Sequence, residues 1–225
     1  MRSTKRKNKK MLAVISFLLL LVFLVTAGTI AWLTRTSSLV NTFTIGAIEI
    51  PTTAPDDSPI EITGNLYEPS WNSEDTHKLI PAATFDKDPY VGIGEGSEDV
   101  AVYVYVENNF SNKVYFDINT GWEAVEATAG YSDPSGEAND ARYTSGLFKY
   151  TAGLSGATTS DVWTEAPLFS SVVVDDTAEL SDFTVAEGKN SEIKISCFLH
   201  QAKDNDGVTI PEDTIEAAAK EALIN

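Results

Sequence analysis

The segment Val100–Val106 constrains the fold more than any other part of the chain, because its side chains alternate with period two. Four valines fall on one face and two tyrosines on the other, namely Val100, Val102, Val104 and Val106, then Tyr103 and Tyr105. β-branched and aromatic residues at this spacing are typical of a strand. Since both faces are apolar, we expect a central strand that is covered on both sides.

Weaker segments of the same kind follow and precede this strand. The further predicted strands are Leu39–Ile50, Ile60–Tyr67, Lys113–Asn119, Leu147–Tyr150, Ser171–Val174, Asp182–Ala186 and Ser191–His200. Polar stretches rich in Gly, Pro, Ser and Thr separate them, at residues 51–59, 129–139 and 153–160. Short strands with such turns predict an all-β fold, a sandwich or a barrel rather than a βαβ arrangement, and we expect an antiparallel β-sandwich.

The C-terminal residues change from strand to helix periodicity. Apolar residues recur at helical spacing at Ile215, Ala218, Ala219, Ala222 and Leu223, and Thr209–Glu212 resembles a capping box. We therefore predict a short amphipathic helix over about 211–224 that packs on the sandwich.

The N-terminal 33 residues have the layout of an export signal. A basic head before position 11 is followed by an apolar run from Met11 to Leu33. The small residues Thr29 and Ala31 suit a signal peptidase, so we expect residues 1–31 to be a signal peptide that is cleaved between Ala31 and Trp32. The alternative is a retained anchor, because a run of this length can also cross a bilayer of about 30 Å.

The charge of the chain excludes one class of partner. Removal of residues 1–31 takes away six of the 16 basic residues and none of the 33 acidic ones, so the formal net charge changes from −17 to −23. Such a chain repels phosphate backbones, and we expect no nucleic-acid binding. The same charge suits divalent cations or a positively charged partner.

Cysteine adds a further constraint. Cys197 is the single cysteine, which excludes an intrachain disulfide even in an exported protein. It is in phase with Ile193, Ile195 and Leu199, and we expect an inert buried thiol. The alternative is a disulfide between chains.

Candidate catalytic and metal-binding residues are few. A zinc protease of the zincin type needs two His four residues apart on a helix with a Glu beside the first, whereas this chain has His77 and His200 alone. We predict no enzymatic activity and no cofactor. Asp204 and Asp206 are weak candidates for Ca²⁺, since they lie in Asp-Asn-Asp-Gly, although a turn explains the same residues.

Three segments resemble the TasA/camelysin family of exported Gram-positive proteins. They are Ala27-Gly28-Thr29-Ile30-Ala31-Trp32 with Asn41-Thr42-Phe43-Thr44-Ile45-Gly46, then Lys87-Asp88-Pro89-Tyr90 with Gly94 and Val100–Val104, then Ile193–Ala202 ending in Gln-Ala. The resemblance implies a jelly-roll sandwich, cleavage by the signal peptidase SipW, and a place on the cell surface or in the biofilm matrix. It also implies fibres in which a freed N-terminal segment completes the sheet of the next subunit.

These observations lead to one expected organisation. Residues 32–50 form an N-terminal extended strand of the donor type, and residues 51–225 form the sandwich with its C-terminal helix. Released by cleavage, the donor strand would insert its apolar residues into another copy; these residues are Phe43, Ile45, Ile48 and Ile50. The alternative is that the segment is the first strand of its own sandwich, and a domain swap would reconcile the two.

The expected function is a secreted, non-catalytic structural protein of the surface or matrix that self-associates into fibres. Its expected partners are other copies of itself, the signal peptidase during export, and other matrix or surface components. The membrane is expected to be contacted through the signal segment alone. A membrane-tethered binding module for a glycan or another ligand is the alternative, and a camelysin-like metalloprotease is a second one.

Overall fold

A computed structural model of the chain describes residues 48–71, 78–110, 112–130, 142–156, 159–184, 191–204 and 206–224. The predicted signal peptide, its cleavage site and most of the predicted strand Leu39–Ile50 lie outside these residues.

Strand β4 (Val100–Asn108) is the central strand of the larger sheet. Strand β4 pairs antiparallel with β10 (Ile193–Gln201) along one edge and with β7 (Arg142–Leu154) along the other edge. The valines of one face are 0–2 % exposed, and Tyr103 on the opposite face is 0 % exposed. The prediction of a central strand with two covered faces is confirmed.

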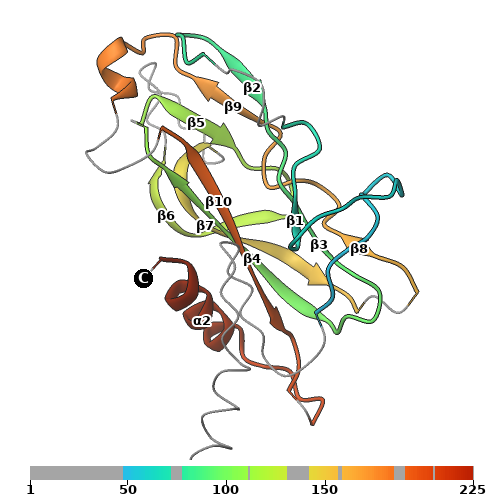
Figure 1. Cartoon of the computed structure of the whole chain (residues 1–225). Helices are drawn as coiled ribbons and strands as arrows, with labels where there is room; N and C mark the ends of the chain where they lie inside the picture. Colours follow the sequence, from blue (N-terminus) through green and yellow to red (C-terminus); the bar gives the residue numbers. More distant parts are fainter. Residues whose placement is uncertain are drawn as a thin grey trace, which may run out of the picture. The chain divides into compact units, whose positions relative to one another are not determined.

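The larger sheet continues from β7 in two directions. Strand β6 (Trp122–Gly130) pairs with one edge of β7. The N-terminal residues of β7 pair with β5 (Val114–Asp117). From β5 the sheet runs through β9 (Ser171–Val174) to β2 (Thr84–Asp86), which gives the order β10-β4-β7-β5-β9-β2 with β6 beside β7. Figure 1 shows this path from β10 and β4 up to β9 and β2.

A smaller antiparallel sheet faces the valine side of β4. Its order is β1 (Leu66–Tyr67), β3 (Tyr90–Ile93) and β8 (Val162–Trp163). Val91 and Ile93 of β3 are fully buried and share one apolar core with the valines of β4 and with Phe116 and Phe148. The predicted antiparallel all-β sandwich is therefore confirmed, whereas the jelly-roll connectivity stays a prediction.

Helix α2 (Glu212–Ile224) covers the tyrosine side of β4, which confirms the predicted C-terminal helix. Ile215 and Ala219 are buried against Tyr103, Leu147 and Phe198 in a second apolar cluster. Lys149 of β7 adds an ion pair to Glu212 at the start of the helix. Thr209, assigned from the sequence to a capping box, instead forms a β-bridge with Lys203. Among the described residues, no helix combines the length and the apolar character needed to cross a lipid bilayer.

Several strand predictions need correction. The predicted strand Asp182–Ala186 is wrong over residues 182–184, because Leu180–Phe183 form a 3₁₀ helix (η1), and its last two residues lie outside the described part of the chain. The carboxylate of Asp182 accepts a hydrogen bond from the N–H of Glu179 (2.8 Å), and this local bond favours the turn. The predicted strand Ile60–Tyr67 is too long, because only its last two residues, Leu66–Tyr67, form a strand.

Strand β6 is an element that the sequence pattern did not indicate. Its residues are rich in Ala and Glu, which favour strands weakly, and its C-terminal end occupies the start of a stretch predicted as turns. It forms because it pairs with β7 over Trp122–Gly130, with bulges that absorb the irregular register.

Cys197 lies in the core, as predicted. It is 1 % exposed and belongs to the same apolar cluster as Ile195 and Leu199. Burial raises the pKa of its thiol to about 12, so the reactive thiolate is absent at ordinary pH.

We therefore expect Cys197 of the folded protein to resist alkylation by iodoacetamide at mildly alkaline pH and to react completely in guanidinium. Mass spectrometry after timed alkylation measures both. Rapid modification of the native protein, or a reducible dimer through Cys197, would contradict the buried position.

Candidate functional site: the N-terminal junction and the free edge of β10

The structure describes two of the four predicted self-association residues. Ile48 and Ile50 lie within the described residues, whereas Phe43, Ile45 and the cleavage residues Ala31 and Trp32 lie outside them. Ile48 is 7 % exposed and packs in the main core of its own domain, while Ile50 is 37 % exposed. The structure therefore gives these two residues different environments.

The backbone of Glu49 is bonded on both sides to its own domain. Its N–H donates to Oγ of Ser97 (2.9 Å), and its carbonyl accepts from the N–H of Gly94 (2.8 Å). A Cβ atom on Gly94 would lie 2.5 Å from the carbonyl oxygen of Ile50, so glycine alone allows this close approach.

The buried side chain of Asn65 completes this junction. Its amide donates to the carbonyl of Glu49 (2.9 Å) and to the carbonyl of Gly92 in β3 (2.9 Å), and the residue is 1 % exposed. A buried amide is costly unless its hydrogen bonds are made. Asn65 therefore holds Glu49 beside β3 and stabilises the junction.

Asp161, just before β8, holds the next residues of the segment. One carboxylate oxygen accepts from the N–H groups of Thr52 (2.6 Å) and Thr53 (2.7 Å) and from both threonine hydroxyls. The other oxygen accepts from the N–H of Glu95 (3.0 Å). The indole N–H of Trp163 donates to the carbonyl of Thr53 (2.9 Å). These bonds join two loops and β8 around one charge.

The hydrogen bonds determine the protonation of Asp161. Burial by itself raises the pKa of this carboxyl, but the donors of Thr52, Thr53 and Glu95 outweigh it, and the pKa lies below its ordinary value of 3.8. Because the folded-state pKa is depressed, the stabilisation is present above the unfolded-state pKa and is lost as the pH falls through the folded-state pKa.

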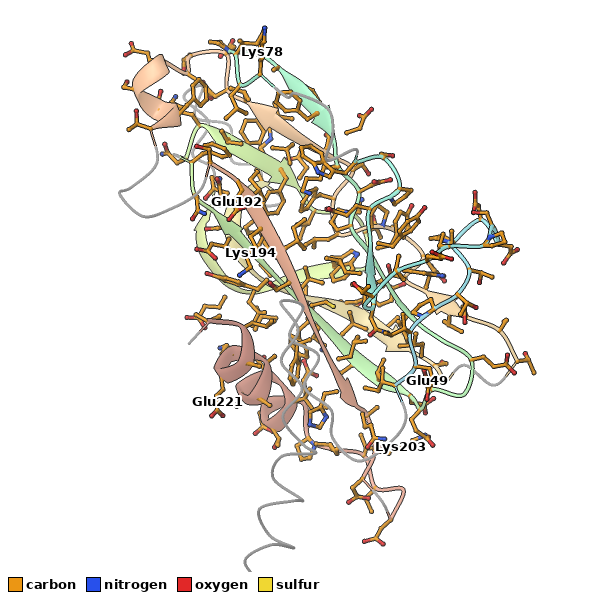
Figure 2. All side chains as sticks on the ribbon, viewed as in Figure 1. Glu49, Lys78, Glu192, Lys194, Lys203 and Glu221 are labelled. Carbon is orange, nitrogen blue, oxygen red and sulfur yellow. The ribbon has the colours of Figure 1, made fainter. Side chains whose placement is uncertain are left out.

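Strand β10 presents a free edge within the part of the chain that the structure describes. All nine of its residues, Ile193–Gln201, pair with β4, and β10 is one of the two terminal strands of the sheet, with β2 at the opposite end. Its inward side chains Ile195, Cys197 and Leu199 are at most 9 % exposed. Figure 2 places Glu192 and Lys194 toward one end of this strand and Lys203 and Glu49 toward the other.

An apolar cavity of about 560 Å³ lies beside the start of β10. Its wall includes Trp71, Phe85, Phe110, Phe183 and Ile193. Lys87 also lines it and is 6 % exposed; its Nζ forms an ion pair with Glu68 (2.8 Å) and lies 4.5 Å from the ring centre of Trp71. A cavity of this size can hold a small ligand or the side chains of an inserted segment.

Asp204 and Gly207 are joined by a turn-type hydrogen bond, in which the N–H of Gly207 donates to the carbonyl of Asp204 (2.9 Å). Oδ1 of Asp204 accepts from the N–H groups of Asp206 (3.0 Å) and Val208 (2.8 Å), and Gly207 has a positive φ of 77°. Within the described ranges, no three His, Cys, Asp or Glu side chains gather as metal ligands do. The Ca²⁺ site at Asp204 and Asp206 stays a prediction.

The structure describes one of the two histidines. His77 lies outside the described residues, and His200 is half-buried at the end of β10 with Nδ1 2.8 Å from the carbonyl oxygen of Gln201. The metalloprotease alternative therefore stays an expectation from the sequence.

Sequence reasoning did not find Ser97, Asn65 or Asp161. Each acts on residues 16 to 109 positions away, and no local spacing marks such a contact. The one available signal was the position of Gly94 in the family-like motif. Comparison of the chain with protein-family profiles, curated proteins and solved structures gave no match.

Replacement of Asp161 by Asn should lower the free energy of unfolding by about 1–3 kcal/mol at neutral pH, since one acceptor of charge-assisted bonds is lost. The difference from the wild type should begin to narrow below about pH 4, near the unfolded-state pKa, and should vanish once the pH has fallen through the lower folded-state pKa, where the wild-type carboxyl is also neutral. Urea unfolding across this pH range measures it. Asp176→Asn, at an exposed position, is the control and should differ little; a pH-independent gap for Asp161→Asn would contradict the assignment.

Proposed function

We propose that this chain is an exported, non-catalytic structural subunit of the cell surface or biofilm matrix that self-associates through its N-terminal strand. The observation that carries the proposal is the free edge of β10. A nine-residue strand with one side unpaired among the described residues offers a row of N–H and C=O groups to another strand.

The chemistry of the incoming strand matches this edge. A strand that pairs with β10 would bring every second side chain against the core, beside Ile195, Cys197 and Leu199. Phe43 and Ile45 have this alternation, with Thr42 before Phe43 and Thr44 between the two apolar residues. Cleavage after Ala31 would give this segment a free N-terminus.

The charge of the subunit makes assembly sensitive to ions. Copies with a formal net charge near −23 after cleavage repel one another, and the repulsion acts over about 30 Å at low ionic strength but about 8 Å at physiological ionic strength. Cations would thus promote assembly without a specific binding site.

The first test concerns the inserted side chains. The secreted double variant Phe43→Asp/Ile45→Asp should give no fibres, because a charge cannot be buried against the core. The matched variant Thr42→Asp/Thr44→Asp, with the same added charge on the other face, should assemble. Negative-stain imaging and light scattering of the secreted material measure this. Equal assembly of both variants would overturn the proposal, and N-terminal sequencing should find Trp32 first.

The second test concerns cations. Assembly should be faster at physiological NaCl than at low salt, and CaCl₂ at matched ionic strength should act in the same way on the wild type and on Asp204→Asn/Asp206→Asn. If the double variant alone fails to respond to Ca²⁺, the turn is a calcium site and screening is insufficient.

The apolar cavity favours a second candidate function, a tethered binding module for a glycan or another small ligand. In that case the membrane-bound protein should keep its Met1 region and bind soluble wall glycan fragments. Trp71→Ala, in the cavity wall, should abolish the binding, whereas Trp122→Phe, in the core, should leave it. Absence of binding by the wild type would remove this candidate.

A further inference from the structure

The first described residues of the chain, from Ile48 to Thr53, are tied to the sandwich domain. From Ile48 onward the chain is bonded to its own domain at Glu49, Thr52 and Thr53. We infer that Ser97, Asn65 and Asp161 form a latch that holds residues 48–53 in their own subunit, so that exchange between copies involves residues upstream of Ile48. The exchange of the upstream residues between copies rests on the proposed function.

Release of residues 48–53 would break several contacts with the domain at once. Asn65, 1 % exposed, would lose the carbonyl of Glu49 as an acceptor, and Asp161 would lose the four donors of Thr52 and Thr53. Ile48 would also leave the apolar core. An unpaired amide is strongly unfavourable at the buried position of Asn65, whereas Asp161 is partly exposed and would exchange its donors for water. These losses would occur together.

The partners of the latch come from three separate places in the fold. Asn65 precedes β1, Ser97 follows β3, and Asp161 precedes β8. Since all three act on the same six residues, loss of one contact leaves the others in place. The latch is therefore a property of the smaller sheet and its loops, not of a single side chain.

The sequence just upstream of Ile48 contains a glycine. Gly46 precedes Ala47 and Ile48, and glycine turns at little steric cost. Residues 39–47 form a nine-residue stretch of about 30 Å when extended, which equals the length of β10. A donor that ends at Ala47 is thus long enough to pair with the whole edge.

The latch changes the assignment of the self-association residues. Phe43 and Ile45 remain donor residues, whereas Ile48 belongs to the core of its own subunit and Ile50 lies on its own surface. It also leaves almost no linker between the donor and its own domain. Successive subunits would then be held in direct contact at a fixed spacing, rather than strung on a flexible tether.

Hydrogen exchange of the protein as the cell produces it tests the latch independently of assembly. The amides of Thr52 and Thr53 should be protected in the wild type and should exchange at least about tenfold faster in Asp161→Asn, a change that corresponds to about 1.4 kcal/mol. The amides of Thr52 and Thr53 should keep wild-type rates in Asp176→Asn. Unprotected amides in the wild type, or equal rates in Asp161→Asn, would overturn the inference.

A cysteine pair shows whether residues 48–53 stay in their own subunit or are exchanged with another copy. The double variant Glu49→Cys/Ser97→Cys introduces one cysteine at each of two residues that are in contact, since the backbone N of Glu49 lies 2.9 Å from Oγ of Ser97. The native Cys197 is buried and does not compete for the disulfide. After assembly and oxidation, a monomer band on a non-reducing gel is expected. A ladder of covalent oligomers would show that residues 48–53 are exchanged and would overturn the latch while leaving self-association intact. If the protein does not assemble, but the disulfide forms within the monomer and the amides of Thr52 and Thr53 are protected, the proposed function is overturned and the latch is not.

Discussion

The burial of β4 on both faces is the constraint from which the rest of the structure follows. Its valine face needs an apolar layer, which the smaller sheet supplies through Val91 and Ile93. Its tyrosine face needs another, which α2 supplies through Ile215 and Ala219. A strand of this kind cannot lie at a surface, so β10 and β7 flank it and the helix must return over the sheet. Among the described residues, this arrangement leaves the outer edge of β10 unpaired at one end of the larger sheet.

Polar contacts, not apolar area, fix the N-terminal junction. Few apolar residues lie between Glu49 and Pro59, and the segment is held by the carboxylate of Asp161 and the amide of Asn65. Such bonds are directional, and they specify where the segment joins the domain more narrowly than apolar packing does. The joint that this creates separates the chain into a domain that stays closed and an upstream strand available for exchange under the proposed function.

Two lysines form ion pairs that link acidic residues of the helix and of the sheet. Lys149 pairs with Glu123 of β6 and Glu212 of α2, and Lys220 pairs with Glu126 and Glu216. Exposed pairs of this kind contribute little each, at most about 1 kcal/mol. Their arrangement nevertheless joins the helix to two strands, and the remaining acidic groups give the subunit the repulsive surface that cations would screen during assembly.

The sequence by itself determined the elements whose pattern is local. Val100–Val106, Ser171–Val174 and the C-terminal helix were predictable because side-chain periodicity records which face is buried. Tertiary structure alone decided β6, whose Ala- and Glu-rich residues are a strand because β7 offers an edge to pair with. It also decided the contact of Asp161 with Thr53, 108 residues apart, since a hydrogen bond between distant residues leaves no periodic trace in either segment.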